Sequence, residues 1–118
     1  MSSILIVDDD PRFRAQARDL LMNEGFDVVG EAVDGGAAID IARTLRPEFV
    51  LVDVGLPDID GFEVARSLAL EDSPPKVVLT SSRDARAYGR RLQSAPVLGF
   101  LPKEQVSGAA IRELASRA

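Results

Sequence analysis

Short runs of apolar and β-branched residues recur along this chain, and helix-like patterns fill the intervals between them. The runs cover residues 3–8, 26–31, 48–53, 76–81 and 97–101. They are mostly continuous rather than alternating in polarity, as is typical of strands that are covered on both faces. A regular alternation of strand and helix predicts an α/β fold, in which a parallel sheet lies between two layers of helices.

Helix signals occur in each interval. Asp10 followed by Pro11 is typical of a helix start, and we expect this first helix to end at residues 23–25. The second and third expected helices follow Asp34 and Asp60, a fourth covers residues 84–93, and the last runs from residue 105 or 107 to 117. The whole chain, residues 1–118, is then expected to form one (βα)5 domain with a doubly wound, five-stranded parallel sheet.

Composition excludes several functions. The chain has no cysteine and no histidine, so thiolate metal sites, imidazole bases and a phosphohistidine donor role are excluded. Its net charge of −5 opposes direct binding to nucleic acid. No apolar run reaches the roughly 18 residues of a membrane span, and no signal-peptide pattern is present, so we expect no membrane association and a cytoplasmic location.

Side chains with carboxylate, hydroxyl or ammonium groups occur where the predicted strands end: Asp8, Asp9, Asp53, Ser81 and Lys103. In a flavodoxin-like strand order the first and third strands are neighbours, so their three carboxylates are expected to converge. Two such charges about 4 Å apart repel by about 4 kcal/mol at an effective dielectric near 20. A bound Mg²⁺ would relieve this repulsion, because it prefers a few oxygen ligands and retains several of its own waters.

A metal-binding acidic site with a hydroxyl and an ammonium group nearby indicates phosphoryl transfer. The metal and Lys103 would neutralise phosphoryl oxygens, and Ser81 would donate a hydrogen bond. Asp53 is the expected nucleophile, because it lies centrally between these groups.

Four separated motifs carry a family resemblance: "LIVDDD", "LVDVGLPDIDG", "VVLTSS" and "GFLPK". With them, the chain resembles the receiver domain of two-component response regulators, the CheY-like family, over its entire length. The resemblance implies that Asp53 accepts a phosphoryl group from a phosphohistidine on a sensor histidine kinase or a histidine phosphotransfer protein. It further implies that Asp9 and Asp53 bind Mg²⁺ directly, Asp8 binds it through water, and Gly55 contributes its backbone carbonyl.

The resemblance also implies a conformational switch made of Ser81 and Phe100. Ser81 lies 22 residues before Lys103, as in the family, although the adjacent Thr80 is an alternative for the switch hydroxyl. Strand alternation allows only one of the two to point inward. A downstream protein target is expected on the face formed by the fourth helix, fifth strand and last helix, while a homodimer on phosphorylation is left open.

Three features depart from the family pattern. Pro102 precedes Lys103, so the cis Lys-Pro peptide common in the family cannot occur. Gly55 and Arg83 occupy positions that tend to tune dephosphorylation in the family, in a direction that the sequence does not give. The arginines at positions 83, 86, 90 and 91 suggest an acidic partner surface or simply a solvated helix face.

Several of these residues, and the function itself, have other interpretations. Asp10, Asp58 and Asp60 are interpreted as capping or turn residues and are left out of the site. One alternative is a haloacid-dehalogenase-type phosphatase, whose Asp-x-Asp pattern Asp8 and Asp10 satisfy superficially. Another is a pseudo-receiver that binds partners without phosphorylation. A third is a receiver excised from a DNA-binding transcriptional regulator, although we expect a free-standing regulator and no conventional enzyme.

Overall fold

The computed structural model describes residues 1–117, and its centre is one parallel sheet with the strand order β2-β1-β3-β4-β5. The strands are β1 (Ser3–Val7), β2 (Asp27–Ala32), β3 (Phe49–Asp53), β4 (Lys76–Ser81) and β5 (Gly99–Pro102). This order confirms the predicted flavodoxin-like fold and places β1 beside β3. The strand ends differ from the predicted ones by only one or two residues, and Pro102 is tolerated because β5 is an edge strand.

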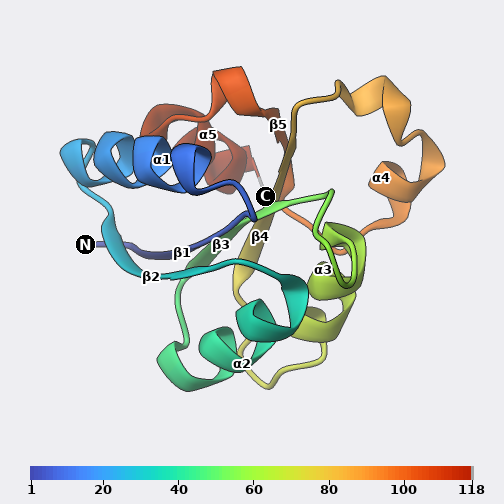
Figure 1. Ribbon diagram of the computed structural model, residues 1–118, viewed down its shortest axis with the longest axis horizontal. Coiled ribbons are helices and arrows are strands. Elements are labelled where there is room, and N and C mark those ends of the chain that lie inside the picture. The colour runs from blue at the N-terminus through green and yellow to red at the C-terminus, as the bar shows by residue number, and fades with distance from the viewer. Residues whose placement is uncertain (118) are drawn as a thin grey trace.

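Helices cover both faces of the sheet (Figure 1). The main helices are α1 (Pro11–Asn23), α2 (Gly35–Leu45), α3 (Gly61–Ala69) and α5 (Gly108–Arg117). Helices α1 and α5 lie on one face, whereas α2 and α3 lie on the other. Within residues 1–117, no helix is both long enough and apolar enough to cross a membrane.

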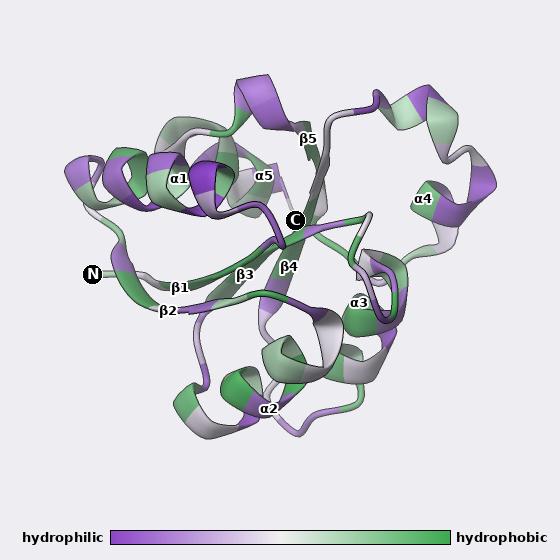
Figure 2. Ribbon diagram, viewed as in Figure 1, coloured by the Kyte–Doolittle hydropathy of each residue, from purple (hydrophilic) through white to green (hydrophobic). Residues whose placement is uncertain are grey.

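Each face of the sheet contributes to its own apolar core. Ile4 and Ile6 of β1 pack toward α1 and α5, while Leu5 and Val7 pack toward α2 and α3. All four side chains are fully buried. Burial on both faces explains why the strands are continuous apolar runs in the sequence. Figure 2 shows that the surrounding helices contain both hydrophobic and hydrophilic residues.

Aspartates cap the helices, as the sequence predicts. Asp10 and Asp60 each accept a backbone N–H from the first turn of the helix that follows, at 2.9 and 3.0 Å. Asp58, in the loop before α3, accepts the N–H groups of Gly35 and Gly36 at the start of α2, at 2.8 and 2.9 Å. These hydrogen bonds lower the pKa of Asp58 to about 2. The capping and turn interpretation of these three residues is therefore confirmed.

The predicted fourth helix over residues 84–93 is wrong in its extent. The chain instead forms a 3-10 turn, η1 (Ala85–Ala87), and a five-residue helix, α4 (Arg90–Ser94). Gly89 separates them with a positive φ of 52°, and neither piece contains a buried residue. A second 3-10 turn, η2 (Lys103–Gln105), precedes α5, so the last helix begins at Gly108 rather than at residue 105 or 107.

Gly61 is required where α3 begins beside β3. Its N–H donates to the carbonyl of Val54 at 3.0 Å, and a Cβ at this position would lie 2.6 Å from the carbonyl oxygen of Asp53. We predict that Gly61→Ala lowers the free energy of unfolding by about 1–3 kcal/mol, the usual cost of overpacking a tight contact. Urea denaturation measures this change.

Gly36→Ala is the matched control for this prediction. A Cβ at Gly36 would make only an ordinary contact, 3.4 Å from Asp58 Oδ2, and alanine is the better helix former. Its free energy of unfolding should be unchanged or raised. Equal losses in both variants would contradict the steric argument at Gly61.

Candidate functional site

Three carboxylates meet at the carboxyl end of the sheet. Asp8 and Asp9 follow β1, Asp53 ends β3, and each offers an oxygen such that all three lie within 4.8 Å of one another. Asp8 is fully buried, Asp53 is 7% exposed, and Asp9 is exposed. The predicted convergence is confirmed, and it follows from the direct pairing of β1 with β3.

Lys103 is the cation that faces this cluster. Its Nζ lies 2.8 Å from Asp8 Oδ2 and 3.9 Å from Asp53 Oδ1. The same ammonium group lies 4.7 Å from the centroid of the Phe13 ring, which covers it from the α1 side. Burial lowers the pKa of Lys103, but the interactions with Asp8 and Asp53 outweigh it and raise the pKa overall. The lysine therefore stays charged, but its one ammonium group offsets only part of the charge of the three carboxylates.

Burial and the excess negative charge of the cluster change the pKa of the Asp53 carboxyl group. Burial, together with the negative charges of Asp8 and Asp9, raises its pKa from the ordinary 3.8 to about 6, although Lys103 lowers it in part. A group with this pKa is mostly ionised near pH 7, but at a cost that a nearby cation would remove. A bound cation would therefore favour the ionised form of Asp53.

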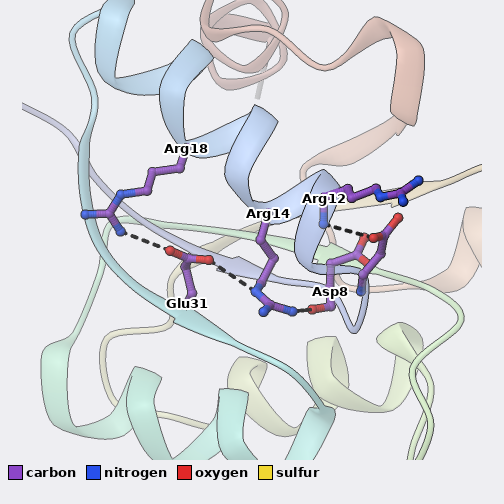
Figure 3. Close-up of polar contacts among 6 residues, drawn as sticks. Asp8, Arg12, Arg14, Arg18 and Glu31 are labelled. Carbon is purple, nitrogen blue, oxygen red and sulfur yellow. Dashed lines mark hydrogen bonds and ion pairs between the residues drawn. The ribbon is translucent and has the colours of Figure 1, made fainter.

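A second set of contacts fixes the position of Asp8. Its Oδ1 accepts the backbone N–H of Asp10 at 2.8 Å, and its carbonyl accepts Arg14 Nη1 at 2.7 Å. Figure 3 shows Arg14 reaching from α1 between Asp8 and Glu31 of β2. Glu31 binds Arg14 at 3.1 Å and Arg18 at 3.0 Å. The turn after β1 is therefore held by an ion-pair network that the sequence interpretation missed, because its members are distant in the chain.

The structure places the hydroxyls of Thr80 and Ser81 in different surroundings. Thr80 is fully buried beside Asp53 in the strand register, and its hydroxyl has no hydrogen-bond partner within residues 1–117. Ser81 Oγ accepts the backbone N–H of Arg83 at 3.0 Å and lies 2.6 Å from the hydroxyl oxygen of Tyr88. Sequence reasoning missed Tyr88, which lies seven residues further along and outside any strand.

Strand alternation separates these two hydroxyls. Val78 packs with the core under α1 and α5, whereas Leu79 packs with the core under α2 and α3. Because side chains alternate along a strand, Thr80 belongs to the first face and Ser81 to the second. Phe100 of β5 packs on the second face, so it shares that face with Ser81.

The remaining candidate residues lie around the same edge of the sheet. Gly55 is exposed in the loop after β3, and a Cβ there would lie 3.6 Å from Asp53 Oδ2. Phe100 is half-buried, with its ring centroid 5.8 Å from that of Tyr88. The predicted roles of Gly55 as a metal ligand and of Phe100 as a switch residue stay predictions.

Two members of the arginine cluster are paired within the chain. Arg91 forms an ion pair with Asp60 and lies 4.3 Å from the centroid of the Phe62 ring, and Arg86 pairs with Asp84 at 3.3 Å. The positive charge that this segment presents to a partner is therefore smaller than the sequence suggests.

The donor set of the cluster suits a hard divalent cation. Three carboxylate oxygens within 4.8 Å, fewer than a full coordination shell, match an ion such as Mg²⁺ that keeps several waters. The raised pKa of Asp53, caused first by burial and then by the charge of Asp8, means that a bound cation would favour the ionised form of this carboxyl group. The residues present therefore fit the ion that the resemblance implies.

Comparison with known sequences identifies the family of this chain. Residues 4–115 match the response regulator receiver domain family, so the chain belongs to this family, the receiver domains of two-component response regulators. It is 36% identical over 105 residues to a putative transcriptional regulator of Pseudomonas aeruginosa, covering 89% of the chain and 51% of the relative. It is 34% identical over 104 residues to the putative positive transcription regulator of virulence factors BvgA of Bordetella pertussis, covering 88% and 50%. The chain thus spans about half the length of these curated relatives.

Solved structures give the same result. The signal receiver domain of the putative response regulator NarL from Mycobacterium tuberculosis superposes with a TM-score of 0.87 at 30% identity, over 98% of each chain. The response regulator domain of CheB from Thermotoga maritima shares the fold, with a TM-score of 0.84 at 21% identity, over 98% of this chain and 95% of that one. An acidic pocket for Mg²⁺ is a property of this family, and the acidic cluster is present here.

The pKa of Asp53 predicts how stability depends on pH when no divalent cation is present. The folded state keeps this proton up to about pH 6, whereas the unfolded chain loses it near 3.8. The unfolding free energy should therefore fall as pH rises through this interval, by up to about 3 kcal/mol at about 1.4 kcal/mol per unit of pKa shift. Asp53→Asn should lose this part of the slope and be more stable than wild type above pH 7.

Urea denaturation in a chelating buffer at a series of pH values measures the slope. Asp72→Asn is the control for removing one carboxylate, because Asp72 is exposed and lies outside the cluster. A slope in Asp53→Asn that equals the wild-type slope would contradict the assignment of the raised pKa.

Proposed function

We propose that this receiver accepts a phosphoryl group on Asp53 from a phosphohistidine of a sensor histidine kinase or a histidine phosphotransfer protein. The observation that carries the proposal is the convergence of Asp53 with two further carboxylates and Lys103 at one edge of the sheet. A carboxylate oxygen of Asp53 attacks phosphorus, an O–P bond forms and the P–N bond breaks. The electron pair of that bond returns to the imidazole nitrogen of the donor.

The acidic cluster would hold Mg²⁺ during this reaction. Asp9 and Asp53 would bind through carboxylate oxygens, Asp8 through water, and Gly55 through its backbone carbonyl. When bound, the ion supplies positive charge that offsets both the carboxylates and the phosphoryl oxygens. Arg14 and the Asp10 amide keep Asp8 in place, so the cluster does not have to reorganise when its charge changes.

Lys103 and Ser81 would contact the phosphoryl oxygens. The ammonium group of Lys103 already lies 3.9 Å from Asp53 and remains charged, so it can neutralise a developing anion. The hydroxyl of Ser81 would donate a hydrogen bond, and Phe100 would respond by repacking, because its ring has no hydroxyl. The α4, β5 and α5 face would then bind a downstream protein target, in a cytoplasmic setting, with a homodimer as one form of output.

Control of transcription is a second candidate for the output. The relatives from Pseudomonas aeruginosa and Bordetella pertussis are described as transcriptional regulators, and the match covers only about half of their length. Their descriptions support an output through a separate DNA-binding part, because this acidic domain is itself unsuited to nucleic acid.

The phosphatase alternative has less support. Asp10, the second aspartate of the Asp-x-Asp pattern, caps α1 through its side chain and is not a member of the acidic cluster. The family match over residues 4–115 also favours a receiver. The pseudo-receiver alternative is opposed by the presence of Asp9, Asp53, Ser81 and Lys103 together.

Intact mass after incubation with acetyl phosphate and Mg²⁺ tests the proposed function. We predict a gain of about 80 Da, the mass of one phosphoryl group in an aspartyl phosphate. Asp53→Ala should show no gain, and a chelator should abolish the gain in the wild type. Adduct formation in Asp53→Ala at the wild-type rate would contradict Asp53 as the acceptor, and absence of any adduct in wild type would favour a pseudo-receiver.

A further inference from the structure

Tyr88 links the segment after β4 to the phosphorylation site. It lies between η1 and α4, and its ring packs between Phe62 and Phe100 with centroid distances of 5.7 and 5.8 Å. Its hydroxyl oxygen lies 2.6 Å from Ser81 Oγ. Neither η1 nor α4 contains a buried residue, so the half-buried Tyr88 is an anchor of this segment.

The hydrogen bond with Tyr88 determines which donor or acceptor of the Ser81 hydroxyl stays free. A serine hydroxyl has one proton and two lone pairs, and the backbone N–H of Arg83 already occupies one lone pair of Ser81. A phenolic hydroxyl is more acidic than an alcohol and is the stronger donor of the two. With Tyr88 donating to the second lone pair, the proton of Ser81 is the only hydrogen-bonding element of this hydroxyl that is still free.

We propose that Tyr88 is a positioning residue for phosphoryl transfer to Asp53, because its hydroxyl orients the Ser81 hydroxyl to donate to a phosphoryl oxygen. The inference rests on the proposed function and extends it to the element that sets the geometry of Ser81. Phosphoryl oxygens only accept hydrogen bonds, so the order runs from Tyr88 O–H to Ser81 O–H to phosphoryl oxygen. Each bond in such a chain polarises the next and strengthens it.

The role belongs to the hydroxyl of Tyr88 rather than to its ring. Phe100 packs on the same ring but has no hydroxyl, so it cannot make this contact. Tyr88→Phe keeps the packing against Phe62 and Phe100 and removes only the hydrogen bond. This variant therefore separates positioning from structure.

A double-mutant cycle on the full chain tests the proposal, with the rate of acetyl phosphate labelling followed by intact mass. Tyr88→Phe should be labelled about fivefold more slowly than wild type, the effect of one neutral hydrogen bond. Its thermal melting temperature should stay close to the wild-type value. In a Ser81→Ala background, Tyr88→Phe should cause no further loss, because its effect passes through Ser81. Ser82→Ala is the matched control, since Ser82 is exposed, and it should be labelled at the wild-type rate.

Tyrosine spectroscopy gives a readout that does not depend on activity. Tyr88 is the single tyrosine of the chain and there is no tryptophan, so the tyrosine absorption band reports on this residue alone. Ser81→Ala should produce a difference spectrum in that band without Mg²⁺ or any phosphoryl donor. Phosphorylation of the wild type should not reproduce this difference spectrum, because the Tyr88 to Ser81 bond is retained.

Four results would overturn the proposal: wild-type labelling in Tyr88→Phe, equal losses from Tyr88→Phe with and without Ser81, an unchanged tyrosine band in Ser81→Ala, or a phosphorylated wild type with the Ser81→Ala spectrum. The last result would mean that the phosphoryl group competes with Tyr88 for Ser81. If the wild type takes no phosphoryl group, the proposed function fails together with the positioning role. If the wild type is labelled and Tyr88→Phe is labelled equally fast, only the positioning role fails.

Discussion

Repulsion among three carboxylates at the ends of β1 and β3 is the constraint on which the rest of the site depends. Asp8, Asp9 and Asp53 bring oxygens within 4.8 Å of one another, and among residues 1–117 only Lys103 forms ion pairs with them. Buried like charges usually destabilise the folded state, because they lose hydration and repel one another. Here Arg14 and the backbone N–H of Asp10 fix the turn after β1, while burial and the charge of Asp8 raise the pKa of Asp53.

The sheet fixes the positions of the strand ends that carry the three carboxylates. Since β1 pairs directly with β3 and their side chains fill both cores, the carboxyl ends of these strands cannot move apart without breaking the sheet. The segment from η1 to α4 is different, because its short helices contain no fully buried residue. Its half-buried Tyr88 contacts Ser81, Phe62 and Phe100. A rigid charged centre beside a weakly held segment is the physical arrangement in which a local change in charge can alter a surface.

Sequence reasoning predicted much of this organisation because it depends on local patterns. Continuous apolar runs gave the five strands, Asp10 and Asp60 marked helix starts, and strand ends located Asp8, Asp9, Asp53 and Lys103. Gly89 ended the expected fourth helix through a backbone conformation that periodicity does not reveal. The contacts of Arg14 with Asp8 and Glu31, and of Tyr88 with Ser81, depend on how far long side chains reach in the folded chain. Thr80 and Ser81 could not be separated because an error of one residue in a strand exchanges its faces.

Lys103 offsets only part of the charge of the carboxylate cluster, and a divalent cation would offset the rest. A ¹³C NMR titration of the Asp53 carboxyl carbon, assigned by comparison with Asp53→Asn, tests this property. We expect a midpoint near pH 6 in chelating buffer, as the raised pKa requires, and a clear fall of that midpoint when Mg²⁺ is added. A midpoint in the ordinary aspartate range without the ion, or a raised midpoint that Mg²⁺ leaves unchanged, would contradict this expectation.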